Sequence, residues 1–283
     1  MTDVAAASSP APSQVLPFVV IEPKGEIEWR ELWRYRDLFR ILAERDIRLR
    51  YRQTALGVVW VILQPLAASL IFATIFGLFA KLPSDGVPYL PFVFTAMLPW
   101  NLLAGGIQRG GNSLLGNTGL ITKIYFPRLI IPIASVAAVL LDFAVAAVVM
   151  LGLILIYGIP ITWSILALPF LVFLTLAATI GVSLLFSALS VYYRDFSYAL
   201  PFALQIWLYG SPVVYASTLI PDQWQLLYGL NPMVGVINGF RWVLLGAPLQ
   251  TATLLESVLV SFLIMVIGAA VFRRVERSFA DVI

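Results

Sequence analysis

The feature that most limits how this chain can fold is its series of long apolar runs. Each run is near or above the ~20 mostly apolar residues that a helix needs to cross a bilayer. Because the bilayer core offers an open backbone no hydrogen bonds, spans of this length and composition fold as helices. The predicted fold is all-α, a polytopic membrane protein with six spans at about residues 56–80, 89–107, 129–157, 163–191, 198–215 and 253–272.

The composition agrees with a membrane protein and excludes several kinds of chemistry. Hydrophobic residues make up 60% of the chain and charged residues 12%, and Cys and His are absent. Disulfides, thiolate or histidine catalysis and ordinary zinc sites are therefore excluded. The chain also lacks a glycine-rich phosphate-binding loop followed by Lys and Ser or Thr. We therefore expect no bound cofactor. If the function of this chain is driven by ATP, a separate polypeptide would bind the ATP.

Two segments precede the first span. Residues 1–27 are rich in Ala, Ser and Pro and lack the pattern of a signal peptide, so we expect a disordered tail. Residues 28–54 carry eight arginines and apolar residues at helical spacing, which predicts an amphipathic helix on the anionic cytoplasmic leaflet. The alternative is a solvated helix stabilised by pairs such as Glu44 with Arg48. The apolar residues are Leu32, Tyr35, Phe39 and Leu42.

The distribution of basic residues predicts the orientation of the chain. With both termini in the cytoplasm, every Lys and Arg except Lys81 and Arg241 falls on the cytoplasmic side. Cytoplasmic loops of membrane proteins carry such an excess of positive charge. The same clustering beside spans explains the net charge of +3 better than nucleic-acid binding does. We therefore expect a bilayer protein with no nucleic-acid partner.

The loop between the second and third spans, residues 114–132, carries Lys123 and Arg128, the only cationic residues between Arg109 and Arg194. A polar, basic segment that contains proline has to lie at a water-facing surface. We expect this surface to be cytoplasmic.

The region between the fifth and sixth spans holds two short apolar pieces, about residues 223–230 and 233–245, separated by Asn231 and Pro232. Neither is long enough to cross a bilayer, which favours re-entrant or interfacial helices over an ordinary external loop. Aromatic residues are dense in the half of the predicted membrane region that faces away from the cytoplasm. They are either members of the interfacial belt or, for a subset, the lining of a passage along which sugar faces slide.

Asp142 is the only carboxylate deep inside a predicted span, because Glu256 lies within the first four residues of the span at 253–272. Placing it there costs about 3 kcal/mol on insertion scales, so the side chain should face protein or water and find a partner. It is either a proton or substrate site or a helix-packing contact to a hydroxyl or amide. We favour the packing contact, because proton-coupled carriers use chains of ionisable groups inside the membrane, whereas Asp142 is a single such group.

An ordered set of short motifs resembles a known family. The motifs are YRDL at 35–38, RDI at 45–47, RYRQT at 50–54, LGVVW at 56–60, KIYFPR at 123–128, YRDF at 193–196 and LNPM at 230–233. Together they resemble the permease subunit of ABC exporters for bacterial polysaccharides, which serve O-antigen, capsule and teichoic acid. The likeness runs from about Ile21 to the C-terminus.

The resemblance implies a function and partners. Such permeases are homodimers of six-span subunits in the bacterial inner membrane. They pair with two copies of an ATP-binding cassette subunit, which holds ATP and magnesium. They export undecaprenyl-linked polymer through a channel at the dimer axis.

The resemblance also implies three groups of residues. Coupling to the ATPase is expected at Asn117, Lys123, Tyr125, Phe126, Pro127, Arg128, Arg194 and Asp195. The interfacial region where substrate enters is expected at Arg45, Arg48, Arg52, Leu56 and Gly57. Candidates for the channel or its external gate are Phe72, Phe76, Trp207, Tyr209, Tyr215, Trp224, Tyr228, Asn231 and Pro232.

Two other functions remain open from the residues alone. The same architecture could export a small lipid or drug. A membrane-embedded enzyme of glycolipid metabolism is the second, but it needs clustered acids at one membrane face. The external carboxylates Asp85, Asp222 and Glu256 are scattered over different segments.

Overall fold

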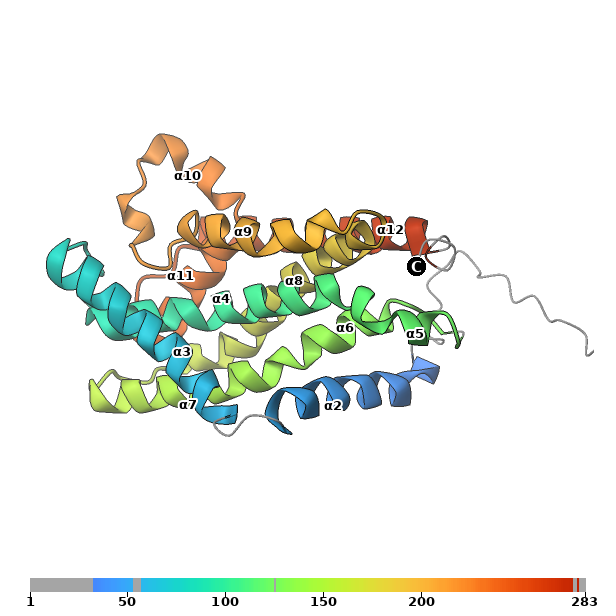
Figure 1. Cartoon of the computed structure of the whole chain (residues 1–283). Helices are drawn as coiled ribbons and strands as arrows, with labels where there is room; N and C mark the ends of the chain where they lie inside the picture. The colour runs from blue at the N-terminus through green and yellow to red at the C-terminus, as the bar shows by residue number, and fades with distance from the viewer. Residues whose placement is uncertain (1–32, 53–56, 125, 277–278, 280–283) are drawn as a thin grey trace, which may run out of the picture.

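The computed structural model describes residues 33–52, 57–124, 126–276 and 279, and these residues form helices joined by short turns, without a strand (Figure 1). The tail at 1–27 and the start of the predicted amphipathic helix lie outside the described residues. Most helices run along one common direction, so the described residues form an elongated bundle (Figure 1). The prediction of an all-α polytopic membrane protein is confirmed.

Among the described residues, five helical segments are long and apolar enough to cross a membrane. They correspond to the first, second, third, fourth and sixth predicted spans. Most contain more than one element. The elements are α3 (Gly57–Phe72) with the π-helix η1 (Ala73–Phe79), α4 (Tyr89–Asn112), α6 (Ile130–Ala137) with α7 (Val139–Ile156), η3 (Trp163–Ala167) with α8 (Leu168–Tyr192), and α12 (Thr251–Glu276). Helix α4 continues five residues beyond the predicted end of its span, so Arg109 lies in its last turn rather than in a loop.

The fifth predicted span corresponds to α9 (Asp195–Tyr209), which has 15 residues. At 1.5 Å per residue such a helix is about 22 Å long, shorter than the ~30 Å hydrocarbon core. It ends at Gly210, where Ser211 and Pro212 follow. A residue before proline avoids the helical conformation, so the chain turns at that point instead of continuing to Tyr215 as the sequence predicted. A sixth crossing therefore stays a prediction.

Two short helices lie between α9 and α12, as the two apolar pieces predicted. They are α10 (Asp222–Gly229) and α11 (Pro232–Leu245). The Asn231 side chain caps α11 by accepting a hydrogen bond of 3.0 Å from the backbone nitrogen of Met233, and Pro232 occupies the first helical position. Helix α11 ends at Gly246, whose φ is +70°. Nearly every residue of α11 is buried among α4, α8 and α12, which an ordinary external loop would not allow.

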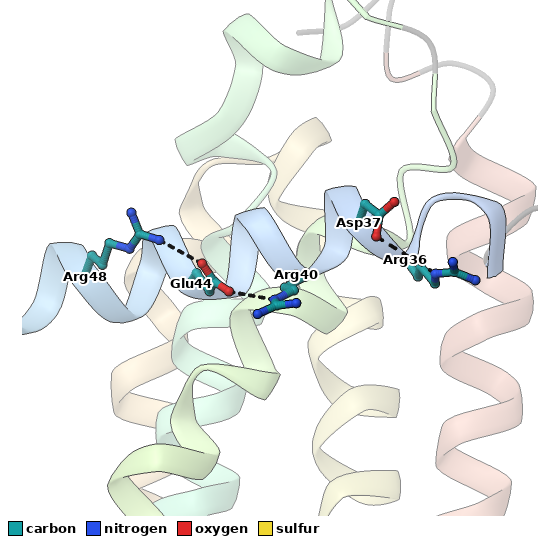
Figure 2. Close-up of polar contacts among 5 residues, drawn as sticks. All are labelled: Arg36, Asp37, Arg40, Glu44 and Arg48. Carbon is teal, nitrogen blue, oxygen red and sulfur yellow. Dashed lines mark hydrogen bonds and ion pairs between the residues drawn. The ribbon is translucent and has the colours of Figure 1, made fainter.

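Helix α2 (Arg36–Arg52) lies alongside α6 (Figure 1). Its two faces carry different side chains. Tyr35, Phe39 and Leu42 pack into protein, although the sequence assigned their face to the bilayer. The opposite face carries ion pairs along its length. Figure 2 shows Arg40 and Arg48 each paired with Glu44 at 2.8 Å, and Arg36 near Asp37 at 3.9 Å. Contact between α2 and a bilayer stays a prediction, for which Ile41 and Leu49 are the exposed apolar side chains.

Buried apolar side chains form two clusters. The larger lies among α4, α7, α8 and α11 and contains Phe92, Met150, Leu174 and Phe240. The smaller joins α2, α6, the end of α8 and the end of α12. We call the end with the smaller cluster the basic end, defined by α2, the segment 114–128 and the last turn of α12. The end that holds α10 and the start of α11 is the aromatic end.

Candidate translocation path and coupling surface

The predicted coupling segment forms a short exposed projection at the basic end (Figure 1). It contains the 3-10 turn η2 (Leu115–Asn117) and the single turn α5 (Thr118–Ile121). Ile121 and Phe126 point into the smaller cluster, whereas Lys123 and Ile124 are exposed. A force applied to the exposed side therefore reaches a close-packed core that α2, α6, α8 and α12 share.

The residues of this segment do not all face outward. Asn117 donates a hydrogen bond of 2.7 Å to the carbonyl of Ser113 and so prolongs the end of α4. Arg128 is half-buried, and its backbone nitrogen donates to Glu276 Oε1 at 2.8 Å. Its guanidinium donates to the Glu276 carbonyl and lies 5.9 Å from the ring of Phe279. Arg128 thus ties the segment to the end of α12. Pro127 is half-buried beside it, and Tyr125 lies outside the described residues.

The second predicted coupling loop joins α8 to α9. Arg194 and Asp195 are exposed in it, together with Tyr193. The ring of Tyr192 lies 6.5 Å from that of Phe279, which also contacts Arg128. Arg128 of the first predicted loop and Tyr192 beside the second therefore both contact Phe279.

At the aromatic end, several predicted gate residues form one hydrogen-bonded network. Asn231 Oδ1 accepts from Trp207 Nε1 at 2.9 Å. Its Nδ2 donates to the Gly210 carbonyl at 3.0 Å and to Ser211 Oγ at 2.9 Å. Tyr228 donates to the hydroxyl of Tyr215 at 3.1 Å, and Tyr215 donates to the carbonyl of Tyr209 at 3.3 Å. The network joins α9, α10 and α11.

The other channel candidates lie apart from this network. Phe72 and Phe76 pair with each other, with ring centroids 6.0 Å apart, and pack against the larger cluster. Trp224 is exposed on α10, and Pro232 is buried at the start of α11. Trp100 belongs to the aromatic residues of the outer half but was not chosen as a channel candidate, and its ring packs edge-on against that of Trp207 with the centroids 6.2 Å apart.

Arg241 is a second residue that sequence reasoning missed, because it was counted only as a positive charge on the outer side of the membrane. It is 2% exposed within α11. Its guanidinium carbon lies 3.5 Å from the ring centroid of Phe92, and Nη2 donates to the carbonyls of Pro212 at 2.7 Å and Val213 at 3.2 Å. The side chain fastens the turn after α9 to α4 and α11.

A polar stripe runs along α4, which is otherwise buried from Pro91 to Asn112. Half-buried residues recur there at intervals of three and four, as on one face of a helix. Helix α4 contacts both α3 and α9, which expose Gln64 and Gln205, respectively. Amide groups are costly against lipid, so this stripe faces water or protein. It was visible in the sequence as polar residues at helical spacing within an apolar run. The stripe consists of Asn101, Ala104, Gly105, Gln108, Arg109 and Asn112.

Asp142 lies beside the end of this stripe and binds side chains from two other helices. Its Oδ1 accepts from the hydroxyl of Tyr51 at 2.5 Å, and Oδ2 pairs with Arg50. Arg109 Nη2 lies 3.9 Å from the same Oδ2. Burial, and then the hydrogen bond to Asp142, raise the pKa of Tyr51 to about 12, so its hydroxyl remains a donor. The expectation that Asp142 finds a partner is confirmed, and the hydroxyl of Tyr51 is one of its three partners.

The residues predicted where substrate enters line α2 before this cluster. Arg45 Nη2 pairs with Asp46 at 2.8 Å, and Asp46 also accepts from Ser135 Oγ on α6 at 2.8 Å. Arg48 is exposed and paired with Glu44. Gly57 begins α3, whereas Leu56 and the side chain of Arg52 lie outside the described residues.

Comparison with known proteins places these features in one family. The sequence pattern of the ABC-2 type transporters matches residues 37–245, which is more than half of the chain. The chain belongs to the ABC-2 type transporter family. The match runs from α2 to the end of α11, and so includes the coupling segment, the polar stripe, Asp142 and the network around Asn231.

Individual ABC-2 relatives align over nearly their whole length. The O-antigen export system permease protein RfbA of Myxococcus xanthus is 28% identical over 256 residues, which covers 89% of this chain and 97% of the relative. The protein of the same name from Klebsiella pneumoniae is 26% identical over 248 residues, covering 87% and 95%. The polysialic acid transport protein KpsM of Escherichia coli is 23% identical over 249 residues, covering 83% and 92%. As an ABC-2 chain, this protein is a multi-pass membrane component of a transporter.

Proposed function

We propose that this chain is the membrane-spanning subunit of an ATP-driven exporter that moves lipid-linked polysaccharide, of the O-antigen type, out of the cytoplasm. The names of its relatives, O-antigen export permease and polysialic acid transport protein, support a polysaccharide as the cargo. The lipid is undecaprenyl, and the membrane is the bacterial inner membrane. The chain itself hydrolyses nothing.

The observation that carries this proposal is the polar stripe of α4. A hydrophilic polymer crosses a bilayer only where the wall offers it water or hydrogen bonds, and Asn101, Gln108 and Asn112 provide such groups along the most enclosed span. The stripe is half-exposed on a single chain, so a second copy facing it would complete an enclosed path. We therefore propose a homodimer with the passage between its subunits.

Two copies of an ATP-binding cassette subunit complete the exporter, and they hold the ATP and magnesium. They bind the exposed parts of the coupling segment and of the loop between α8 and α9. The direct route for their motion is through Ile121 and Phe126 into the smaller cluster. Both termini lie in the cytoplasm, and the basic end faces the cytoplasm as well.

Two measurements test this function. Deletion of the gene should leave lipid-linked glycan inside the cell, and its chemistry identifies the cargo. The purified chain should show no ATP hydrolysis alone, and ATP hydrolysis should appear when its ATP-binding partner is added. ATPase activity of the chain alone, or an unchanged surface glycan in the deletion strain, would contradict the proposal.

A further inference from the structure

The cluster around Asp142 has more positive charge than one carboxylate can neutralise. Arg50 on α2 and Arg109 on α4 both approach Asp142 Oδ2 on α7. Guanidinium groups stay ionised under all ordinary conditions, so two of them with one carboxylate leave a net charge of about +1. The side chains of both arginines are 31% exposed, so a ligand can reach them.

Arg109 in particular has unused hydrogen-bond donors. Its contact with Asp142 is 3.9 Å, which is longer than a hydrogen bond. Asp142 is already engaged by Tyr51 and Arg50. Among the described residues, no hydrogen bond to another group is made by the Arg109 guanidinium. An arginine in the last turn of a membrane-spanning helix lies at the depth of lipid headgroups, where such donors meet anions.

We propose that Arg109 and Arg50 bind the phosphate of a lipid headgroup, which takes the place of the Asp142 carboxylate. The planar fork of arginine matches phosphate oxygens in pairs, and two forks from different helices suit a pyrophosphate. The inference rests on the proposed function, because the lipid tail stays in the bilayer while the attached polymer extends along the stripe that begins at Arg109.

The exchange also changes how α2 is held. In the absence of ligand, Asp142 fastens the end of α2 to α7 through Arg50 and Tyr51. A phosphate that captures Arg50 and Arg109 releases this tie. The site therefore reports an arriving headgroup by loosening the end of α2 from α7, and Asp142 acts as a competitor that sets the affinity.

The test measures binding of prenyl phosphates to the full-length chain in detergent. Thermal unfolding is followed through the 8 tryptophans while farnesyl pyrophosphate, farnesol or inorganic pyrophosphate is titrated. Farnesyl pyrophosphate should stabilise the wild type, farnesol should not, and inorganic pyrophosphate should bind at least about tenfold more weakly because it lacks the tail.

Two substitutions should act in opposite directions. Arg109→Gln should weaken farnesyl pyrophosphate binding by about tenfold or more, since it removes a charge-assisted bidentate contact. Arg109→Lys should lose less, because it keeps the charge without the fork. Asp142→Asn should strengthen binding severalfold by removing the competitor, even if the unliganded protein melts earlier. Arg36→Gln, on the exposed face of α2, is the matched control and should bind like the wild type.

Equal binding by Arg109→Gln and the wild type would overturn the site, as would weaker binding by Asp142→Asn. Equal binding of inorganic and farnesyl pyrophosphate would overturn the lipid headgroup as ligand. These failures are distinct from failure of the proposed function, because the deletion strain would still accumulate glycan and the ATP-binding partner would still activate.

Discussion

Arginine is held in different ways at the two ends of this molecule. At the basic end, several arginines of α2 pair with carboxylates, as Arg40 and Arg48 do with Glu44 on the exposed face in Figure 2. At the aromatic end, Arg241 is buried without a carboxylate within ion-pair distance among the described residues. It is held by backbone carbonyls and by the face of Phe92, and its Nε has no hydrogen-bond partner.

The arginine contacts at the basic end can exchange their partners, whereas those at the aromatic end hold the helices in place. Exposed ion pairs are weak and exchange readily with water, lipid phosphate or a partner protein. A buried guanidinium that satisfies several carbonyls cannot leave without stranding them. The basic end is therefore suited to receive partners and substrate, whereas the aromatic end keeps α4, α9 and α11 in a fixed arrangement.

The largest expected effect concerns which end faces the cytoplasm. The chain contains no cysteine, so a single introduced cysteine can be labelled without background. Thr122→Cys, at the exposed coupling segment, should stay unlabelled by an impermeant thiol reagent in intact cells and react after permeabilisation. Gln223→Cys, exposed on α10, should react in intact cells. Labelling of Thr122→Cys in intact cells would reverse the orientation and remove the basis for the coupling surface.

Arg241→Ala should cause the largest loss of stability among these substitutions. It leaves the carbonyls of Pro212 and Val213 without a donor and opens a space beside Phe92. We expect a loss of about 3 kcal/mol or more, measured by thermal unfolding in detergent. The melting temperature of Arg241→Lys should lie between those of the wild type and Arg241→Ala, since one ammonium group cannot reach every carbonyl. An unchanged melting temperature would mean that the aromatic end is not fixed by this residue.

A smaller effect is expected at the tie between α2 and α7. Asp142→Ala and Arg50→Ala should each lower the free energy of unfolding of the protein. The double mutant should lose less than the sum of the two single losses, with a coupling energy of about 1–2 kcal/mol. Both side chains are partly exposed, which keeps the value below that of a fully buried pair. Additive effects would show that the two residues act independently, and the distinction between the faces of α2 would lose its support.

The smallest effect is expected on the exposed face of α2. Hydrogen bonds from Arg40 and Arg48 lower the pKa of Glu44 below its ordinary value of 4.5. Any stabilisation is therefore present above that value and lost as the pH falls through the lower pKa of the folded state. Because the two ion pairs lie at the surface and are screened by solvent, Glu44→Gln should match the wild type in thermal unfolding at neutral pH and in acid. A clear loss of thermal stability at neutral pH would show that these ion pairs also hold the structure in place.

Much of the fold could be predicted from local patterns. The apolar runs identify the spans because a bilayer forces any chain segment that crosses it into a helix. Two short pieces separated by Asn231 and Pro232 became α10 and α11, since cap and helix-start chemistry acts within a few residues. The exposed position of Lys123 followed from its place in a basic loop between spans.

The sequence by itself thus determined the elements, their apolar character and the basic loop, because each depends on neighbours within a few turns. Only the tertiary structure decided which faces are buried and which charges meet. Arg128 bonds a residue 148 positions away, and Tyr51 bonds Asp142 across 91 positions. No local period encodes such pairings. The burial of Arg241 and of the apolar face of α2 likewise depends on helices that pack against them from distant parts of the chain.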